Sequence, residues 1–231
     1  MIKIRKSNDR GFANHGWLKS WHSFSFANYF DKNHMGFGNL RVINEDKISG
    51  GAGFGEHPHN NMEIITYVIS GALSHRDSMG NSSIILPKEV QVMSAGTGVF
   101  HSEFNHEKNQ ETHLLQIWIL PKKLQVAPRY DQKSFASELD KNDLTLVVSG
   151  LGRDGSIKIN QDAEIFIGKF TTPKTINFAI KKDRKIWLQM ICGEMLINDL
   201  KLENNDAVAI ENEKEIKLSS LKNCEFLLFD L

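Results

Sequence analysis

The chain has 231 residues, with 28 basic and 28 acidic side chains and no net charge. This balance excludes the strongly basic surface on which nucleic-acid binding depends, so no direct nucleic-acid partner is expected. No apolar run approaches the length of about 18 residues that a transmembrane helix needs, and the first residues have no apolar segment typical of a secretion signal. We therefore expect a soluble cytoplasmic protein without membrane contact, folded as one large domain or two of about 100 to 130 residues.

Apolar residues recur in short, often alternating runs, which is typical of a protein built from many short β-strands. The clearest runs are residues 63–69, 114–120 and 185–191. Turn residues separate such runs at 70–71, 78–81, 152–155 and 192–193. Only residues 133–139 indicate a helix. The sequence therefore predicts an all-β sandwich or barrel.

Two pairs of side chains carry the chemistry. His57 and His59 are separated by one residue, so on a strand both imidazoles project from the same face. His101 and Glu103 repeat this spacing after two nearby glycines, which let the backbone turn tightly. A lone histidine is usually a surface or hydrogen-bonded residue, but two same-face pairs favour a metal site. Three imidazoles and one carboxylate suit Fe, Ni, Cu, Mn or Zn rather than Ca or Mg, and four protein ligands leave a six-coordinate metal two free positions.

The two halves of the chain differ in chemistry. All nine histidines lie at or before His113, whereas the remainder is rich in Lys, Glu and Asn. This asymmetry predicts a boundary near residues 128–145. We place it after residue 132, which gives an N-terminal metal-binding domain of residues 1–132 and a C-terminal domain of residues 133–231.

A weak internal repeat relates the halves. Residues 67–73 resemble residues 189–195, and residues 86–93 resemble residues 202–210. Two copies of one β-fold explain both similarities. A hand alignment puts four residues without ligand chemistry at the positions of His57, His59, His101 and Glu103, in that order: Ala179, Lys181, Leu218 and Ser220. The C-terminal domain is therefore expected to lack the metal ligands.

These residues resemble the two motifs of the cupin superfamily. The matching positions are Gly51, His57, His59 and Glu63 in the first motif and Gly98, His101 and Asn105 in the second. The chain is more closely similar to the pirin family of bicupins, and within it to the bacterial pirin-like proteins described as quercetin 2,3-dioxygenases. The stretches that carry this similarity are residues 21–26, 57–59, 75–81, 93–98 and 101–103. The resemblance is specific over about residues 10–131 and general beyond, and it implies two jelly-roll β-barrel or sandwich domains packed together.

Two carboxylates compete for the place of fourth ligand. Glu63 lies an even number of residues from His57 and His59, so on one continuous strand all three side chains would project from the same face. It is also the usual cupin ligand. Similarity to pirins favours Glu103 as the ligand. Glu63 is then expected to contact the ligands rather than the metal itself.

Other residues leave alternatives open. Residues 75–77 could form a polar network near the metal, but their place beside Gly80 favours a structural turn. The aromatic stretch 21–26 around His22 could line a flat pocket or belong to the core. Cys192 and Cys224 each sit among apolar residues, and we expect both to be buried, reduced thiols.

The resemblance implies a metal-dependent dioxygenase that cleaves quercetin or a related flavonol or enol with O2. In that chemistry the substrate oxygen binds the metal and loses its proton, so Glu103 is expected to be both ligand and catalytic proton acceptor, with a pKa near the working pH. The cofactor is expected to be one divalent transition metal acting as a Lewis acid, iron before nickel, copper, manganese, zinc or cobalt. Because pirin itself resembles this sequence, the alternative is a non-enzymatic, redox-sensing interaction protein or transcriptional cofactor with a protein partner. We expect a monomer, since nothing resembles a coiled coil.

Overall fold

The computed structural model describes residues 1–231, which form two compact units. The N-terminal unit comprises residues 11–134 with residues 159–161, and the C-terminal unit comprises residues 1–10, 135–158 and 162–231. Both are built almost entirely from strands, so the predicted all-β class is confirmed. None of the helices has the length and apolar character of a membrane span.

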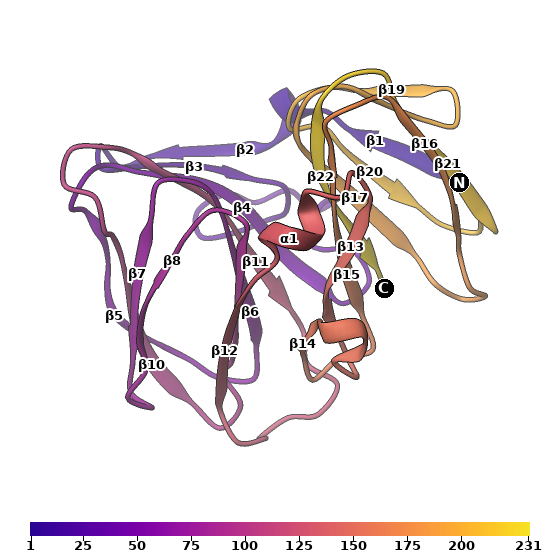
Figure 1. The fold of residues 1–231 in the computed structure, drawn as a ribbon. Coiled ribbons are helices and arrows are strands. Elements are labelled where there is room, and N and C mark those ends of the chain that lie inside the picture. Colours follow the sequence, from indigo (N-terminus) through magenta and orange to yellow (C-terminus); the bar gives the residue numbers. More distant parts are fainter. The chain divides into compact units, whose positions relative to one another are not determined.

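Two antiparallel sheets form the N-terminal unit (Figure 1). Its strands are β2 (Gly11–Asn14), β3 (Leu18–His22), β4 (Leu40–Ile48), β5 (Gly53–His59), β6 (Glu63–Ser70), β7 (Leu73–Asp77), β8 (Ser82–Ile85), β9 (Glu89–Ser94), β10 (Val99–Asn105), β11 (Thr112–Ile119) and β12 (Arg129–Ser134). Seven of them pair in the order β12-β9-β6-β11-β4-β3-β2, and the other four in the order β5-β10-β7-β8. Buried aliphatic side chains from both sheets pack together, among them Val68 and Leu114 from the larger sheet and Leu73 and Ile85 from the smaller. Each such side chain contributes roughly 1.5–3 kcal/mol to folding, so this cluster holds the sheets face to face.

The C-terminal unit repeats this plan. Its elements are β1 (Ile2–Arg5), α1 (Ala136–Leu139), β13 (Leu144–Ser149), β14 (Ile157–Lys158), β15 (Glu164–Phe170), β16 (Lys174–Ala179), β17 (Ile186–Cys192), β18 (Met195–Ile197), β19 (Leu200–Leu202), β20 (Ala207–Ile210), β21 (Glu215–Ser220) and β22 (Cys224–Asp230), with short 3-10 turns at Ser7–Asp9 and Arg153–Gly155. The seven-stranded order is β1-β20-β17-β22-β15-β13-β14 and the four-stranded order is β16-β21-β18-β19. Strands β6 and β7 therefore correspond to β17 and β18, which confirms the predicted repeat.

Two short segments depart from the predicted division after residue 132. Residues 1–10, which the sequence assigns to the N-terminal domain, belong to the C-terminal unit because β1 pairs with β20. This is visible in Figure 1, where the indigo first strand lies beside later strands. Residues 159–161 join the N-terminal unit, where the Asn160 carbonyl accepts a hydrogen bond of 2.7 Å from the backbone N–H of Lys122.

The strand register corrects the hand alignment of the repeat. In the N-terminal unit Glu103 lies opposite His75 and His101 lies opposite His57. In the C-terminal unit Leu218 lies opposite Ile197, the counterpart of His75 in the repeat, and Ile216 lies opposite Phe178. Leu218 therefore corresponds to Glu103 and Ile216 to His101, and Phe178 rather than Ala179 takes the place of His57. One residue of offset matters because it moves a side chain to the other face of the strand.

The counterpart of His59 moves in the same way, from Lys181 to Ile180. Phe178 packs against the apolar core of the C-terminal unit, and Ile180, Ile216 and Leu218 are buried members of that core. Hydrocarbon therefore fills the space that corresponds to the histidine cluster.

The predicted helix over residues 133–139 is wrong in its first half. Residues 129–134 form β12, which pairs with β9 through six consecutive residues, and only Ala136–Leu139 are helical. A short helix forms few internal hydrogen bonds for the residues that it orders, so pairing with a neighbouring strand is more stable where such a strand is available.

The expectation for the cysteines is correct for one residue only. Cys224 is buried, whereas Cys192, the last residue of β17, is exposed. The register shift between Met190 and Cys192 lies at this strand end. Both thiols are free.

Candidate metal centre

The structure brings His57, His59 and His101 together. Their ring centroids lie 4.9 Å apart for His57 and His59, 4.4 Å for His57 and His101, and 4.9 Å for His59 and His101. One nitrogen of each ring lies within 4.8 Å of the others, which is close enough for a shared ion.

Strand geometry explains this convergence. His57 and His59 lie two residues apart on β5 and therefore project from the same face, and β10 places His101 directly opposite His57. The turn before β10 needs glycine, because Gly96 has a φ of +46° and an added Cβ would lie 2.0 Å from the Val126 carbonyl oxygen. The two sequence motifs therefore meet across one strand pair.

A hydrogen bond orients the imidazole of His57 for a metal, and burial favours the neutral form of the other two imidazoles. The Nδ1–H of His57 donates to the Gly55 carbonyl at 2.8 Å, so Nε2 carries the lone pair. This Nε2 lies 3.0 Å from Nε2 of His101. Burial, with a smaller effect of His57, lowers the pKa of His59 to about 4 and that of His101 to about 2. Neutral imidazole is the form that binds metal ions.

Glu103 lies beside this cluster but not within it. The carboxylate is 2% exposed and forms a second group with His75 and His101, in which one ligand atom of each residue lies within 4.8 Å of the others. The reason is a register shift in the pairing of β10 with β5. His101 pairs with His57, but Glu103, two residues later, pairs with Phe54. The four sequence-predicted ligands are thus divided between two groups that share His101.

The environment of Glu103 favours a proton on its carboxylate. Burial raises its pKa to about 7, and the nearby charge of Asp46 adds to the shift. Oε2 accepts a hydrogen bond of 2.9 Å from Nε2 of Gln116, whereas the buried Oε1 has no hydrogen-bond partner. Three imidazoles and this buried, unpartnered oxygen fit a divalent transition ion.

Glu63 lies outside both groups. It begins β6 in the seven-stranded sheet, and its Oε2 accepts a hydrogen bond of 2.6 Å from Ser94 Oγ. Glu63 does not continue the strand of His57 and His59, because β5 ends at His59 and the chain turns at Asn61, whose φ is +47°.

The two interpretations of residues 75–77 apply to different residues. Asp77 organises the turn, because its Oδ1 accepts hydrogen bonds from the backbone N–H groups of Met79 and Asn81. His75 is fully buried on β7, 5.3 Å from the His101 ring, and its Nε2 lies 3.1 Å from Oδ2 of Asp77. The alternation of His75 and Asp77 on one strand was the sequence signal for this arrangement.

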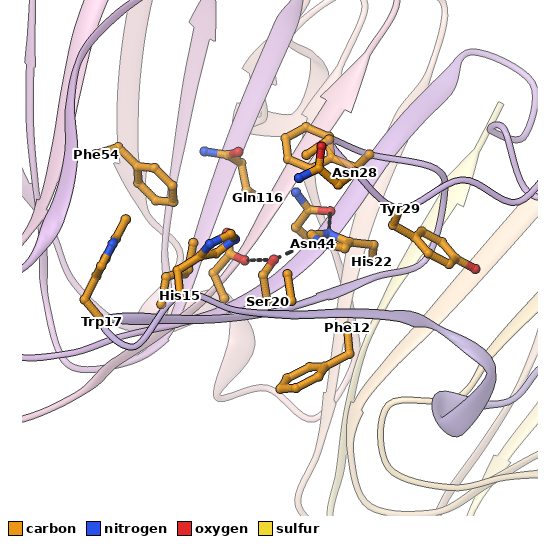
Figure 2. Close-up of a pocket in the computed structure, with 15 residues that line it drawn as sticks. Phe12, His15, Trp17, Ser20, His22, Asn28, Tyr29, Asn44, Phe54 and Gln116 are labelled. Atoms are coloured by element: carbon orange, nitrogen blue, oxygen red, sulfur yellow. Dashed lines mark hydrogen bonds between the residues drawn. The ribbon is translucent and has the colours of Figure 1, made fainter.

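A pocket of about 510 Å³ lies in the same unit (Figure 2). Its aromatic walls are Phe12, Trp17, Phe26, Tyr29 and Phe54, and its polar wall is Ser20, His22, Asn44, Asp46 and Gln116. Of the aromatic stretch 21–26, His22 and Phe26 line the pocket, whereas Phe24 is buried in the core. None of the clustered histidines lines it. Gln116 connects the two sites, because it lines the pocket and donates to Glu103.

Paired strands build the polar wall. β3 and β4 place Ser20 opposite Asp46 and His22 opposite Asn44. Ser20 Oγ donates to the Asp46 carboxylate, and Nδ1 of His22 lies 2.8 Å from Oδ1 of Asn44; Figure 2 shows both hydrogen bonds. Burial raises the pKa of Asp46 to about 7. Of these side chains only His22 was a candidate from the sequence, whereas Ser20, Asn44 and Asp46 resemble ordinary strand residues there.

Comparison with known proteins identifies the family. The Pirin family model matches residues 3–119, and the model of the quercetinase C-terminal cupin domain matches residues 146–231. The chain belongs to the pirin family. The second match extends the relationship beyond residue 131, where sequence motifs gave only a general likeness, and confirms the expected bicupin fold.

Individual pirin relatives match along their whole length. The chain is 47% identical over 231 residues to a protein of Escherichia coli K12 named quercetin 2,3-dioxygenase, covering 100% of the chain and 99% of that relative. It is 40% identical to a pirin-like protein of Caulobacter vibrioides, with the same coverage. The crystal structure of YhhW from Escherichia coli matches with a TM-score of 0.97 at 47% identity, covering 100% of this chain and 97% of that one. The structure of bacterial pirin YhhW in complex with nickel(II) matches with a TM-score of 0.96 at the same identity, covering 100% and 99%.

Proposed function

We propose that this pirin is a metal-dependent dioxygenase that cleaves quercetin or a related flavonol or enol with O2. The observation that carries the proposal is the convergence of three imidazoles, His57, His59 and His101, beside the buried carboxylate of Glu103. Relatives at 47% identity are named quercetin 2,3-dioxygenase, which supports the reaction class.

The proposed ligands are the three histidines, with Glu103 from the neighbouring group as the fourth. The nickel(II) complex of YhhW supports a divalent transition ion, and the preference for iron stays a prediction. When bound, the ion supplies Lewis-acid activation of the substrate oxygen and a centre for reaction with dioxygen.

The pocket suits a flat polyphenol. Its volume of about 510 Å³ lies within the usual range of small-molecule sites. Aromatic side chains such as Phe26 and Phe54 pack against rings, while the carboxylate of Asp46 and the amide of Gln116 can bind hydroxyl groups. These side chains orient the substrate toward Glu103.

Glu103 is the proposed proton acceptor. Its Oε1 is free to take the proton of the substrate hydroxyl, while Gln116 holds Oε2 in place. A pKa of about 7 lets this carboxylate accept and return a proton near neutral pH. The buried setting of Glu103 keeps bulk water away from that proton.

A second candidate is the metal-containing, redox-sensing interaction protein. One observation favours it: the outward face of β10, the strand that carries His101 and Glu103, exposes Phe100 and Phe104 by 51% and 41%. Such a patch can contact a protein partner. Turnover of a flavonol in air distinguishes the enzyme from this alternative.

Metal analysis and an oxygen electrode test the proposal together. The chain is purified without added metal, its metal content is measured, and oxygen uptake is followed with quercetin before and after chelation. We expect a divalent transition ion at about one per chain and oxygen uptake that chelation abolishes. A metal-containing chain that consumes no oxygen with quercetin would refute the proposed substrate, and a chain unable to hold any such ion would refute the enzyme.

A further inference from the structure

The group formed by His75, His101 and Glu103 lies deeper than the three-histidine cluster. Their exposed fractions are 0%, 1% and 2%. β7 and β10 place Glu103 directly opposite His75, so these side chains project from one face of the small sheet. One ligand atom of each of the three residues lies within 4.8 Å of the others.

Each member of the group is held through one polar atom and leaves another unused. Asp77 holds Nε2 of His75, Gln116 holds Oε2 of Glu103, and Nε2 of His101 lies 3.0 Å from His57. The atoms left without a hydrogen-bond partner are Nδ1 of His75, Nδ1 of His101 and Oε1 of Glu103, and all three are buried. A buried polar atom without a partner costs roughly 1–3 kcal/mol, so three in one group require an explanation.

The hydrogen bonds determine where the protons are. Nε2 of His75 must donate to the carboxylate of Asp77, so Nδ1 of His75 carries a lone pair. Nδ1 of His57 donates to a carbonyl, so its Nε2 is an acceptor and the proton between the two rings belongs to Nε2 of His101. Nδ1 of His101 then carries a lone pair as well.

With Glu103 ionised, the group therefore presents two imidazole lone pairs and one carboxylate oxygen, with no proton among them. One water molecule can donate only two hydrogen bonds and would leave one acceptor unpaired. A cation bound through one ligand atom of each residue contacts all three side chains at once. The contact between His75 and Asp77 is also the arrangement by which a carboxylate orients a metal-binding histidine.

We propose that His75, His101 and Glu103 form a second, inner position for a divalent transition ion, alternative to the outer position at His57, His59 and His101. Neutral His101 can offer a lone pair from only one of its nitrogens, so one ion occupies one position at a time. His75 is a ligand of the inner position only. The inference goes beyond the proposed function, because it holds whether or not the chain oxygenates quercetin.

Removal of the outer ligands isolates the inner position. The variant His57→Ala/His59→Ala removes the two ligands that belong to the outer position only, and nickel(II) is the probe. We expect this variant to retain about one nickel ion per chain after gel filtration. Adding His75→Ala to it should weaken nickel binding by more than about 10-fold, because a ligand is lost. Arg76→Ala is the matched control, since Arg76 is the next residue of β7 and is exposed.

The outcomes separate the inner position from the proposed function. If the double variant binds no nickel, or if His75→Ala leaves its affinity unchanged, the inner position does not exist. The wild-type chain, assayed in parallel for nickel and quercetin turnover, tests the outer position and the enzyme. Should the double variant fail to fold by circular dichroism, anomalous scattering from nickel-loaded wild-type crystals decides: we expect a peak between His75 and Glu103, and a peak at the outer position alone overturns the proposal.

Discussion

Gln116 donates a hydrogen bond of 2.9 Å to Glu103 from a side chain that also lines the aromatic pocket. A single amide thus joins the place where a substrate can bind to the carboxylate proposed to take its proton. Gln116 also stabilises the ionised form of Glu103 against the effect of burial.

Gln116→Leu should therefore raise the pKa of Glu103 further and move the acid limb of the activity profile to higher pH. Hydrogen bonds to charged groups contribute about 1.5–3 kcal/mol, so we expect a decrease in kcat of roughly 10- to 100-fold at neutral pH. The pH dependence of quercetin turnover measures this. Gln132→Leu is the control, because Gln132 contacts Ile84 and Glu89 instead. Equal profiles for the two variants would remove Gln116 from the mechanism.

His101→Ala should abolish metal binding and activity with little loss of fold. His101 belongs to both groups of candidate ligands, so its loss removes a ligand from either position. Elemental analysis of the purified variant measures the result, and His113→Ala, which removes a histidine paired with Glu45, is the control. A normal metal content in His101→Ala would contradict the assignment.

The stability of the metal-free chain should depend on Glu103. Burial raises the pKa of this carboxyl from 4.5 to about 7, so the folded chain holds its proton more tightly than the unfolded chain does. Its contribution is fully present below pH 4.5 and is lost as the pH rises toward about 7. Glu103→Gln removes the ionisation, so the variant should gain up to about 3 kcal/mol over wild type between pH 4 and pH 8.

Urea unfolding of metal-free wild type and Glu103→Gln at both pH values measures this difference. Comparing the two proteins removes the opposite effects of His59 and His101, whereas the charge of Asp46, which acts on Glu103, is part of the measured difference. A constant difference across this pH range would show that Glu103 titrates normally.

Phe26→Ala should weaken flavonol binding without changing the metal content. Phe26 lines the pocket and packs edge-on against Trp118, with ring centroids 5.4 Å apart. Loss of one aromatic contact corresponds to an increase in KM of about 10-fold. Steady-state kinetics with quercetin test this, with Phe30→Ala as the control because Phe30 is 73% exposed. An unchanged KM would place the substrate elsewhere.

The sequence predicted the fold class and much of the site because both depend on local periodicity. The spacing of His57 and His59 and the identity of His101 sufficed to predict their convergence, since alternation on a strand determines which face each side chain takes. The position of Glu103 could not be predicted, because the register shift between β5 and β10 depends on the pairing of two distant segments. The choice for His75 between a polar network near the metal and a structural turn stayed open for the same reason, because His75 enters the group through its pairing with Glu103.

Oxygen incorporation tests the central claim most directly. The metal-loaded chain is supplied with quercetin and isotopically labelled dioxygen, and the product is analysed by mass spectrometry beside the product of His101→Ala. We predict that wild type consumes one O2 per quercetin and places both labelled oxygen atoms in the product, whereas His101→Ala gives no labelled product. Unlabelled product, or equal labelling with the variant, would contradict a dioxygenase reaction at the histidine cluster.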